Sequence, residues 1–460
     1  MFILSLSRSL AGALLLSGAA TTQAATLLVT VKNDSYDGQC NLNCSLRDAV
    51  QVANQSADAD IILLPSGTYK LTRPNLRNDD NQPIDEDDNL IGDLDVTGEL
   101  LIKGGGIGKS IIEGLTEDLF AVEHRLIEVH PGASLSLDRM TLTDGRSAQN
   151  GGAVENHGSL LLRNVHVLRN ITRTVALAGD PSLSGRGGAI ANYGTLRVLA
   201  SRLEYNSALG EYPFNLAMGG ALFNSGSLLV RDSHLSGNDA GSFSLTGAGG
   251  ALFNSGRATL ESSSFTTNGN YAEGGTLTNQ GGVLTVINST LSNNIEGALT
   301  NGRDDAALGS RSRARLTNVT ITDNTGEIPN IYAVMNWGEL SIRNSLIAGN
   351  QDYYSDEAQN CRNFGDHYSY QAIGLLRNDE QSNCSADLFV PYAQTFTQVL
   401  SPTLTSDGKT SFHALLPGSP AIDAGIGDCI AKDQRGVTRP KDGNGDGVAV
   451  CDLGAYELIP

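Results

Sequence analysis

The feature that most constrains the fold of this chain is a cassette that is written twice. Residues 219–238 read GGALFNSGSLLVRDSHLSGN, and residues 249–268, thirty positions later, read GGALFNSGRATLESSSFTTN. Repeats of this length are typical of solenoids and propellers, in which each unit buries its apolar face by stacking on the next unit. The cassette therefore predicts a stacked architecture rather than a single thick core.

Further copies of the cassette are marked by a turn Asn that is followed, two residues later, by Gly. Looser copies begin at Asn279 and Asn301, and their second Asn residues are Asn294 and Asn324. We predict that both rows of Asn stack coil over coil, with side-chain amides hydrogen-bonded along each row. The first row holds Asn156, Asn192, Asn224, Asn254 and Asn336, and the second row, fourteen residues further on in each copy, holds Asn170, Asn206, Asn238, Asn268 and Asn350.

The spacing of apolar residues within each copy indicates strands. Counting from each turn Asn, positions +4, +6 and +11 are apolar with few exceptions. The +4 and +6 pair has the alternation of a half-buried strand, and the +11 residue belongs to a second strand after a bend. Short strands with Gly and Asn at the corners predict an all-β parallel β-helix. The predicted core residues are Leu135, Leu137, Leu142, Leu160, Leu162, Val167, Leu196, Val198, Leu203, Leu228, Val230, Leu235, Ala258, Leu260, Phe265, Leu340, Ile342 and Ile347.

The composition agrees with a thin solenoid. Only 5% of the residues are aromatic, and 53 of the 460 residues are Gly, which suits tight corners better than a thick core. Segments of variable length recur at one corner, at residues 171–186, 208–218 and 239–248. Binding surfaces of solenoids tend to form on such loops.

The N-terminal part departs from the repeat. Residues 1–24 combine a lone Arg8, an apolar run too short to span a bilayer, and small residues, as in a cleaved secretory signal. Residues 25–70 are expected to form an N-terminal cap and a first coil. There, Ser45 and Asp48 have the spacing of a capping box ahead of an apolar helical face. We expect this short helix to cover the open end of the sheets.

An acidic insertion, residues 71–99, separates the cap from the repeats. Acidic runs are usually solvated, and a loose cation site is the alternative. The repeats then occupy residues 100–350. Residues 351–460, in which the register loosens, are expected to form the last coils and a closing cap. The acidic residues of the insertion are Asp79, Asp80, Asp85, Glu86, Asp87, Asp88, Asp93 and Asp95.

The six cysteines fall in close pairs. An even number in an exported chain favours disulfides, although the sequence alone leaves their connectivity open. We predict pairing by proximity, as Cys40–Cys44, Cys361–Cys384 and Cys429–Cys451. The formal net charge of −19 argues against nucleic acid as a partner, because its recognition needs clustered Lys and Arg. After the N-terminal signal, we expect no transmembrane segment.

The strongest motif for a bound ion is the loop DGNGDG at residues 442–447. Asp442, Asn444 and Asp446 offer oxygen ligands at alternate positions, as in the first half of an EF-hand-like calcium loop. Leu453 stands where the bidentate Glu is expected, and Asp452 or Glu457 is the candidate substitute. The competing interpretation is a plain Gly/Asp turn held by the Cys429–Cys451 pair. Calcium is the one cofactor that the sequence indicates.

These residues together resemble a known family at both ends of the chain. Residues 44–49 read CSLRDA, with Asp48 where the family has Glu, and residues 92–98 read GDLDVTG. Residues 418–425 read GSPAIDAG and residues 433–436 read DQRG. The chain is thereby similar to bacterial exported β-helix proteins with a CSLREA-type N-terminal domain and a choice-of-anchor Q-type C-terminal domain. The resemblance implies a right-handed, single-stranded, pectin-lyase-like β-helix with a surface or adhesin-like role.

Two classes of function remain open. The first is a non-catalytic exported protein, whether secreted, periplasmic or at the cell surface, that binds a glycan or a cell-surface ligand through its loops and a sheet face. The second is a polysaccharide-active enzyme, a lyase or a glycoside hydrolase. Such an enzyme needs paired carboxylates, or a calcium site beside an Arg or Lys, on the outward face of one sheet. A structural component of the cell surface is the third hypothesis.

The outward positions +5 and +7 favour the binding hypothesis. They hold one acidic residue, Glu261, and a sparse basic line of Arg163, Arg231 and Arg343. Solvated Arg explains this line as well as contact with an acidic glycan does. His166 and His234 share position +10 but belong to non-adjacent coils, so we expect no metal or catalytic pair from them. The sequence therefore predicts no catalytic residue.

Overall fold

The computed structural model describes most of the chain after the expected signal. The expected secretory signal, apart from Ala24, and the acidic residues Asp79, Asp80, Asp85 and Glu86 lie outside the described residues. No helix among the described residues is long and apolar enough to cross a membrane. The described ranges are 24–73, 87–115, 124–174, 184–210, 216–242, 247–270, 274–303, 312–327, 331–354, 357–378 and 382–460.

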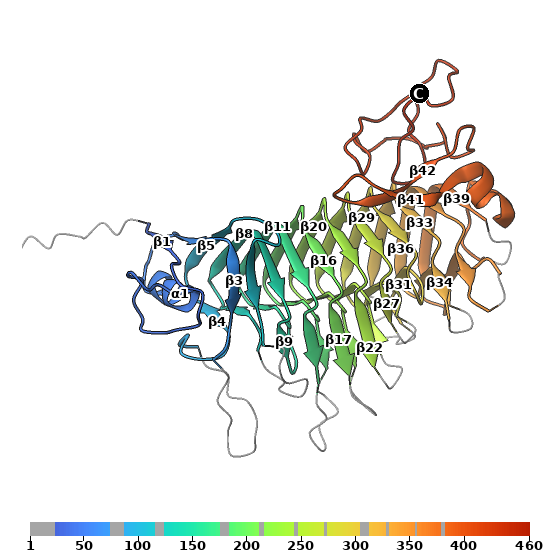
Figure 1. The fold of residues 1–460 in the computed structure, drawn as a ribbon. Coiled ribbons are helices and arrows are strands. Elements are labelled where there is room, and N and C mark those ends of the chain that lie inside the picture. The colour runs from blue at the N-terminus through green and yellow to red at the C-terminus, as the bar shows by residue number, and fades with distance from the viewer. Residues whose placement is uncertain are drawn as a thin grey trace, which may run out of the picture.

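The α-helix α1 (Leu46–Asn54) covers the N-terminal end of the structure (Figure 1). It begins with the capping box, in which the Ser45 side chain accepts a hydrogen bond from Asp48 N and the Asp48 side chain accepts one from Ser45 N. Its apolar face, including Ala49 and Val50, belongs to the main hydrophobic core. The helix therefore covers the open end of the sheets, which would otherwise expose apolar side chains and unpaired backbone groups.

The chain then coils into a right-handed, single-stranded parallel β-helix (Figure 1). Successive coils pair in parallel, as β19 (Leu222–Asn224) does with β24 (Leu252–Asn254), where Phe223 lies beside Phe253. That pairing is the thirty-residue offset of the cassette. Each coil contributes a strand to a ten-stranded sheet and further strands to a twenty-stranded sheet.

The ten-stranded sheet is built of three-residue strands. They are β4 (Leu94–Val96), β7 (Ile127–Val129), β10 (Val154–Asn156), β14 (Ile190–Asn192), β19, β24, β28 (Leu277–Asn279), β31 (Leu299–Asn301), β35 (Val334–Asn336) and β38 (Cys361–Asn363).

The twenty-stranded sheet follows the turn Asn in each coil. Its strands are β1 (Thr26–Leu28), β2 (Asp60–Leu64), β3 (Gly67–Lys70), β5 (Glu99–Gly104), β6 (Ser110–Glu113), β8 (Ser134–Thr143), β11 (Ser159–Leu168), β15 (Thr195–Leu199), β16 (Arg202–Glu204), β20 (Ser227–Arg231), β21 (His234–Ser236), β25 (Arg257–Glu261), β26 (Ser264–Thr266), β29 (Val283–Ile287), β30 (Thr290–Ser292), β32 (Arg313–Thr317), β33 (Thr320–Thr322), β36 (Glu339–Ile347), β39 (Ser369–Arg377) and β40 (Leu388–Phe389).

Smaller sheets form at the loop corner and at the C-terminal end. The five-stranded sheet holds β9 (Arg146–Ser147), β12 (Ile171–Arg173), β17 (Ser207–Gly210), β22 (Asp239–Ser242) and β27 (Gly269–Asn270), and the three-stranded sheet holds β13 (Gly185–Arg186), β18 (Ala217–Met218) and β23 (Gly247–Ala248). The remaining elements are β34 (Thr325–Gly326) paired with β37 (Gln351–Asp352), a 3-10 helix (Tyr392–Gln394), a π-helix (Thr395–Val399), and β41 (Leu400–Ser406) paired with β42 (Ser411–Leu415).

The apolar positions +4, +6 and +11 form the core of the β-helix. Every core residue predicted from these positions is buried, with at most 5% of its surface exposed. The bend before position +11 places a residue in the left-handed region, with φ of 52° at Asn164 and 51° at Asp232. Asn and Asp tolerate this region better than other side chains do, which explains their recurrence at the bend.

Two ladders of Asn side chains run along the inside of the corners. In the first, Asn192 Nδ2 donates to Asn224 Oδ1 at 2.6 Å, and Asn224 Nδ2 donates to Asn254 Oδ1 at 2.7 Å. In the second, Asn206 Nδ2 donates to Asn238 Oδ1 at 3.0 Å. All of these residues are fully buried. Each amide therefore satisfies a polar group of the next coil at a place that water does not reach.

The paired glycines of the cassette form the corner before β10, β14, β19, β24 and β28 of the ten-stranded sheet. Gly219 has a φ of +74°, which disfavours other residues. A Cβ atom on Gly220 would lie 2.2 Å from the carbonyl oxygen of Gly250 on the next coil. The coils can therefore stack at this corner only because both positions lack a side chain.

Residues 400–460 belong to the segment 351–460 that we expected to form the last coils and a closing cap, and they pack against the side of the coils (Figure 1). Arg202 Nη2 donates to Gly408 O at 3.0 Å, and Ser411 N donates to Ser264 Oγ at 2.9 Å. Near the last coils, Arg343 Nη2 donates to Ile426 O at 3.3 Å. The segment has no repeat with which to continue the stack, and polar side chains on the outer face of the coils satisfy its backbone groups instead.

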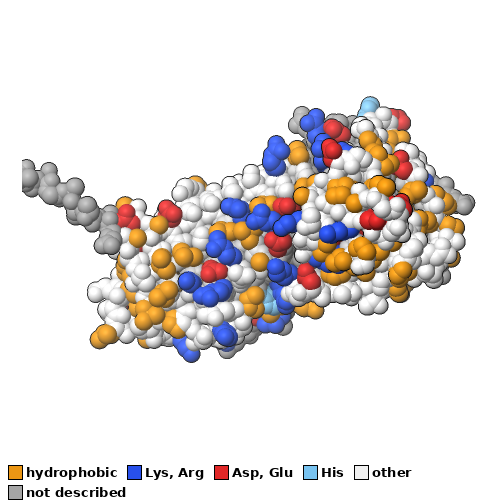
Figure 2. Space-filling model, turned by 90° about the horizontal axis from the view of Figure 1, so that it is seen from above, with side chains coloured by type: hydrophobic (Ala, Val, Ile, Leu, Met, Phe, Trp, Pro, Cys, Tyr) orange, Lys and Arg blue, Asp and Glu red, His pale blue; other side chains and the backbone are white. Residues whose placement is uncertain are grey.

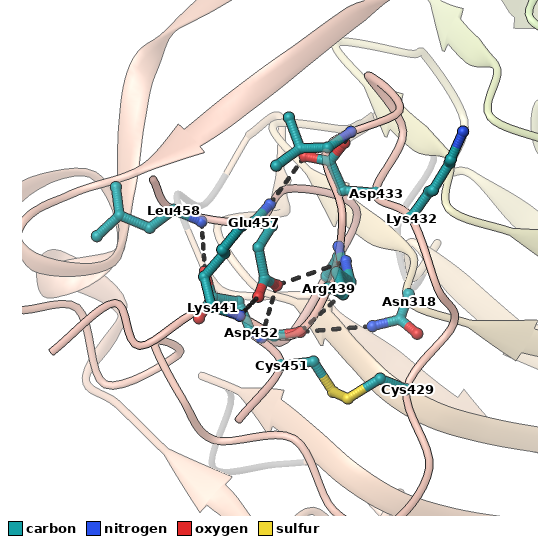
Figure 3. A network of polar contacts seen from close by, with 12 residues as sticks. Asn318, Cys429, Lys432, Asp433, Arg439, Lys441, Cys451, Asp452, Glu457 and Leu458 are labelled. Carbon is teal, nitrogen blue, oxygen red and sulfur yellow. Dashed lines mark hydrogen bonds and ion pairs between the residues drawn. A yellow bond between two sulfur atoms is a disulfide. The ribbon is translucent and has the colours of Figure 1, made fainter. Parts of the chain in front are cut away.

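A buried polar network fixes this C-terminal segment (Figure 3). Arg439 Nη1 donates to Asp452 O at 3.1 Å, and Arg439 Nε lies 3.5 Å from Glu457 Oε2. Glu457 also accepts hydrogen bonds from Lys441 N at 2.7 Å and from Asp452 N at 3.0 Å. Asn318, between β32 and β33, donates to Asp452 O at 3.4 Å and so ties the network to the β-helix.

Three disulfides join Cys40 to Cys44, Cys361 to Cys384 and Cys429 to Cys451. The first lies directly before α1, the second joins the last coils, and the third lies beside the C-terminal network (Figure 3). Each bridge therefore stands where the repeated coil pattern gives way to irregular backbone.

Candidate functional site

Polar and aromatic side chains gather on the outer face of the ten-stranded sheet. In β10, Val154 and Asn156 point into the core and the ladder, so Glu155 between them points outward. The parallel register stacks Asp95, Glu128 and Glu155 on three successive coils. The same outward row continues through Ala191, Phe223, Phe253, Thr278, Thr300, Met335 and Arg362. The row therefore begins with carboxylates and passes into aromatic side chains.

Four carboxylates, Asp93, Asp95, Glu128 and Glu155, form an acidic cluster at the N-terminal end of this row. Arg125 Nε lies 2.6 Å from Asp93 Oδ2, its Nη2 lies 2.5 Å from Glu128 Oε2, and its Nη1 is bonded to Glu155 Oε2. Exposed fractions are 3% for Asp93, 1% for Asp95, 9% for Glu128 and 8% for Glu155. Carboxylates beside a guanidinium on the outward face of one sheet are the arrangement that the enzyme hypothesis required.

Asp95 is the most deeply buried member of the acidic cluster. Its Oδ1 lies 3.0 Å from His130 Nε2, whereas its Oδ2 is buried and has no hydrogen-bond partner among the described residues. Burial, and next the charge of Asp93, raise the pKa of Asp95 to about 7. Burial lowers the pKa of His130, but the hydrogen bond to Asp95 and the charge of Glu128 outweigh it, so the pKa of His130 is raised. Asp95 therefore titrates near neutral pH.

The CSLRDA and GDLDVTG motifs meet at this site. Arg47 is fully buried, and its guanidinium donates to the carbonyl oxygens of Gly92 at 2.7 Å and Asp93 at 2.8 Å. Its Nε also pairs with Asp34 Oδ1 at 2.7 Å. The first motif thus holds the backbone of the second motif in the position that aims Asp93 and Asp95 into the acidic cluster.

Asn89 supports the same segment from the other side. It has a φ of 59° and is fully buried. Its Oδ1 accepts a hydrogen bond from Asp95 N at 3.0 Å, and its Nδ2 donates to Asp95 O at 2.9 Å. The position of Asp95 is therefore set by side chains from two separate segments rather than by the β4 strand alone.

An aromatic row, consisting of His157, Tyr193, Phe223 and Phe253, continues from the acidic cluster. His157 Nε2 lies 3.1 Å from Glu155 Oε1, and the rings of His157 and Tyr193 stack with centroids 4.8 Å apart. The rings of Phe223 and Phe253 also stack, at 5.7 Å, but these two residues are only 6% and 7% exposed. The side chain of His157 is 34% exposed. The His157–Tyr193 pair is therefore the more accessible end of the row.

The predicted calcium loop at residues 442–447 is an exposed turn. Asp442 Oδ1 accepts a hydrogen bond from Gly445 N at 2.8 Å, and Asn444 Oδ1 accepts one from Asp446 N at 2.9 Å. Glu457, one of the candidate completing ligands, is committed to the buried C-terminal network. Calcium binding by Asp442, Asn444 and Asp446 stays a prediction. Within the described ranges, the groups of at least three close ligand side chains both include Asp95: Asp87, Asp95 and His130, and Asp93, Asp95 and Glu128.

The outward residues of the twenty-stranded sheet do not form one site. Glu261 and Arg231 line a cleft of about 500 Å³ between this sheet and the C-terminal segment, where Arg435 pairs with Asp433 at 2.6 Å. Arg343 is bonded to the C-terminal segment instead of lying on an open face. Figure 2, which views this side of the molecule, shows Lys and Arg side chains scattered among Asp and Glu rather than in a continuous stripe.

The two histidines at position +10 have separate partners. His166 Nε2 lies 2.7 Å from Glu204 Oε2, and His234 Nδ1 lies 2.7 Å from Ser264 Oγ. They lie on β11 and β21, and β16 lies between these strands in the sheet.

Sequence reasoning missed Arg125, Glu128, His130 and Glu155. It counted outward positions only after the turn Asn, whereas Glu155 stands directly before Asn156. The alternation of a strand makes the position before an inward Asn an outward one. Applied to each copy, that rule would have identified Glu155, Phe223 and Phe253.

No protein-family model matches this chain, and no curated protein matches it. Two solved structures similar to it are polysaccharide lyases. A crystal structure of pectate lyase Pel9A has a TM-score of 0.42 and 13% sequence identity, covering 95% of this chain and 98% of its own. A PL6 alginate lyase in complex with a trisaccharide has a TM-score of 0.31 and 12% identity, covering 85% of this chain and 91% of its own.

Proposed function

We propose that this protein binds a glycan along the outer face of the ten-stranded sheet, at the strip where the acidic cluster meets the aromatic row. The observation that carries the proposal is the contact between Glu155 and the stacked pair of His157 and Tyr193. Carboxylate oxygens accept hydrogen bonds from hydroxyl groups, and exposed aromatic rings offer an apolar face with a polar edge. Few precisely placed polar groups beside aromatic side chains are what a small-molecule or saccharide site requires.

The strip has the dimensions of a site for several sugar units. It crosses six paired strands, from β4 to β24. At a strand spacing of about 4.8 Å this corresponds to roughly 24 Å along the helix axis. An elongated polymer that follows the axis would be centred on the His157–Tyr193 pair, the more accessible part of the strip.

Cleavage of an acidic polysaccharide is the second candidate function. It is favoured by the convergence of three carboxylates on Arg125, with a fourth, that of Asp95, 3.0 Å from His130. We rank it below binding for two physical reasons. Arg125 pairs with three carboxylates of the cluster, so its guanidinium is already engaged within the protein. Asp95 is also only 1% exposed, so a substrate does not reach it in this conformation.

A glycan array followed by titration of the bound sugar tests the first proposal. We expect Tyr193→Ala and Glu155→Gln each to weaken binding at least tenfold, because they remove a stacking face and a charged acceptor. Tyr205→Ala is the matched control, since Tyr205 is 63% exposed outside the strip. Absence of any bound glycan, or equal weakening by Tyr205→Ala, would refute the proposal. Turnover of a uronate polymer, detected through unsaturated or reducing ends, would instead establish the second function.

We also infer that the protein is exported and that residues 1–24 are removed. Three disulfides suit an oxidising compartment. The resemblance to exported β-helix proteins supports the same inference and leaves a secreted, periplasmic or cell-surface location open. N-terminal sequencing of the secreted protein tests this inference, and an uncleaved N-terminus would contradict it.

A further inference from the structure

The acidic cluster brings four buried carboxylates together around one guanidinium. Its four carboxylates are each at most 9% exposed, and Arg125 is the guanidinium that pairs with Asp93, Glu128 and Glu155. The Arg47 guanidinium, which holds the backbone of Asp93, is paired with Asp34. His130 is the partner of the fourth carboxylate, Asp95. Buried charge of this kind is costly unless a counter-charge is present.

The unpartnered oxygen of Asp95 points to where the counter-charge belongs. Asp95 Oδ2 is buried and has no hydrogen-bond partner among the described residues. One carboxylate oxygen each from Asp93, Asp95 and Glu128 lies within 4.8 Å of the other two. Calcium holds oxygen ligands at about 2.3–2.6 Å, so two ligands across the ion lie up to about 5.2 Å apart. The three oxygens can therefore contact one calcium ion without rearrangement of the strands.

We propose that Asp93, Asp95 and Glu128 bind a hard divalent cation of the calcium class. Oxygen ligands alone favour calcium over the transition metals, which prefer nitrogen and sulfur. Asp93 directly precedes β4, Asp95 lies in β4 and Glu128 lies in β7, so the ion would crosslink two adjacent coils. Arg47 and Asn89 fix the backbone of Asp93 and Asp95 and thereby preorganise the site. The proposal does not depend on glycan binding, because the ion neutralises the cluster with or without a sugar.

Calorimetric titration of CaCl₂ into protein stripped with EDTA tests this proposal, with a thermal-unfolding scan of the same samples. We expect one calcium per chain and a raised unfolding temperature. Asp95→Asn should weaken calcium binding at least tenfold. It should not lower the unfolding temperature of the calcium-free protein, because it replaces a buried carboxylate by a neutral amide of the same shape. Glu128→Gln provides a second variant if Asp95→Asn does not fold.

Asp446→Asn, in the exposed loop at residues 442–447, is the matched control. It should leave the calcium titration unchanged if the ion binds at the acidic cluster. No heat and no shift of the unfolding temperature at millimolar CaCl₂ would overturn the proposal. So would a titration that survives in both Asp95→Asn and Glu128→Gln, or one that is lost only in Asp446→Asn. Glycan binding is measured separately, with and without EDTA. Failure of the calcium proposal can therefore be told apart from failure of the glycan proposal.

Discussion

Replacement of Arg47 by Met is the sharpest test of how the N-terminal cap supports the acidic cluster. The Arg47 guanidinium is fully buried and forms hydrogen bonds to Asp34 and to the carbonyl oxygens of Gly92 and Asp93, among others. Met preserves most of the apolar volume but supplies no donor. The variant would leave Asp34, 1% exposed at its side chain, without its cation, and would release the backbone ahead of β4.

The size of the effect follows from these contacts. Removal of one partner of a buried ion pair costs about 3–5 kcal/mol, because the other charge stays buried without compensation. If this cost falls on local opening of residues 89–97, their amides should exchange roughly 100- to 5,000-fold faster. The amide of Leu94, bonded to Leu126 O at 3.0 Å, and that of Asp95, bonded to Asn89 Oδ1 at 3.0 Å, are the direct reporters.

Hydrogen–deuterium exchange resolved over peptides is the suitable assay. Arg197→Met provides the matched control, since Arg197 is an exposed, outward residue of β15, and its replacement should change stability by less than about 0.5 kcal/mol. Unchanged exchange of residues 89–97 in Arg47→Met would refute the reasoning. Equal acceleration in coils far from the cap would show instead that the coils open as one unit.

Three further predictions concern the scaffold. Asn224→Ala should cost about 2–4 kcal/mol in urea unfolding, because it leaves buried amide groups of two neighbouring coils unpaired, whereas Ser225→Ala should be nearly neutral. Burial raises the pKa of Asp239 from 3.8 to about 6, so the protonated form is favoured on folding and stability is lost as the pH rises through 6. The free energy of unfolding of Asp239→Asn should therefore equal that of the wild type near pH 3.5 and exceed it at pH 8 by at most about 3 kcal/mol. Equal free energies of unfolding for the two proteins at both pH values would contradict this. Replacement of Cys361 and Cys384 by Ala should cost about 3 kcal/mol, and an unchanged urea midpoint would contradict the expected closure of that loop.

The coil register could be predicted from sequence because its determinants are local and repeated. The turn Asn, the +4 and +6 pair and the corner glycines occur together in both copies of the written-twice cassette, so Leu228 and Val230 could be placed in the core from the cassette alone. The capping box of α1 is equally local, since Ser45 and Asp48 are three residues apart. Such features are set by backbone geometry within one or two coils.

The acidic cluster and the C-terminal segment could not be placed in the same way. Glu128 and Glu155 lie on different coils, and their meeting with Asp93 through Arg125 depends on register between coils and on a residue outside the strands. Contacts such as that of Arg202 with Gly408 join positions 206 residues apart, and no repeated sequence pattern predicts them. Long-range contacts made by irregular backbone leave little trace in a single sequence.

The side-on position of residues 400–460 also changes the expected cooperativity of unfolding. A plain solenoid behaves like a one-dimensional array in which each unit interacts only with its neighbours and either end can fray. Here the C-terminal segment contacts coils from Arg202 to Arg343, so opening any of these coils strains bonds with a distant part of the chain. The coils that contact residues 400–460 should therefore unfold together in one cooperative step. The coils that carry the acidic cluster precede those contacted by residues 400–460, so their local opening costs least free energy. A bound ion or ligand would therefore have its largest effect on the population of the closed state there.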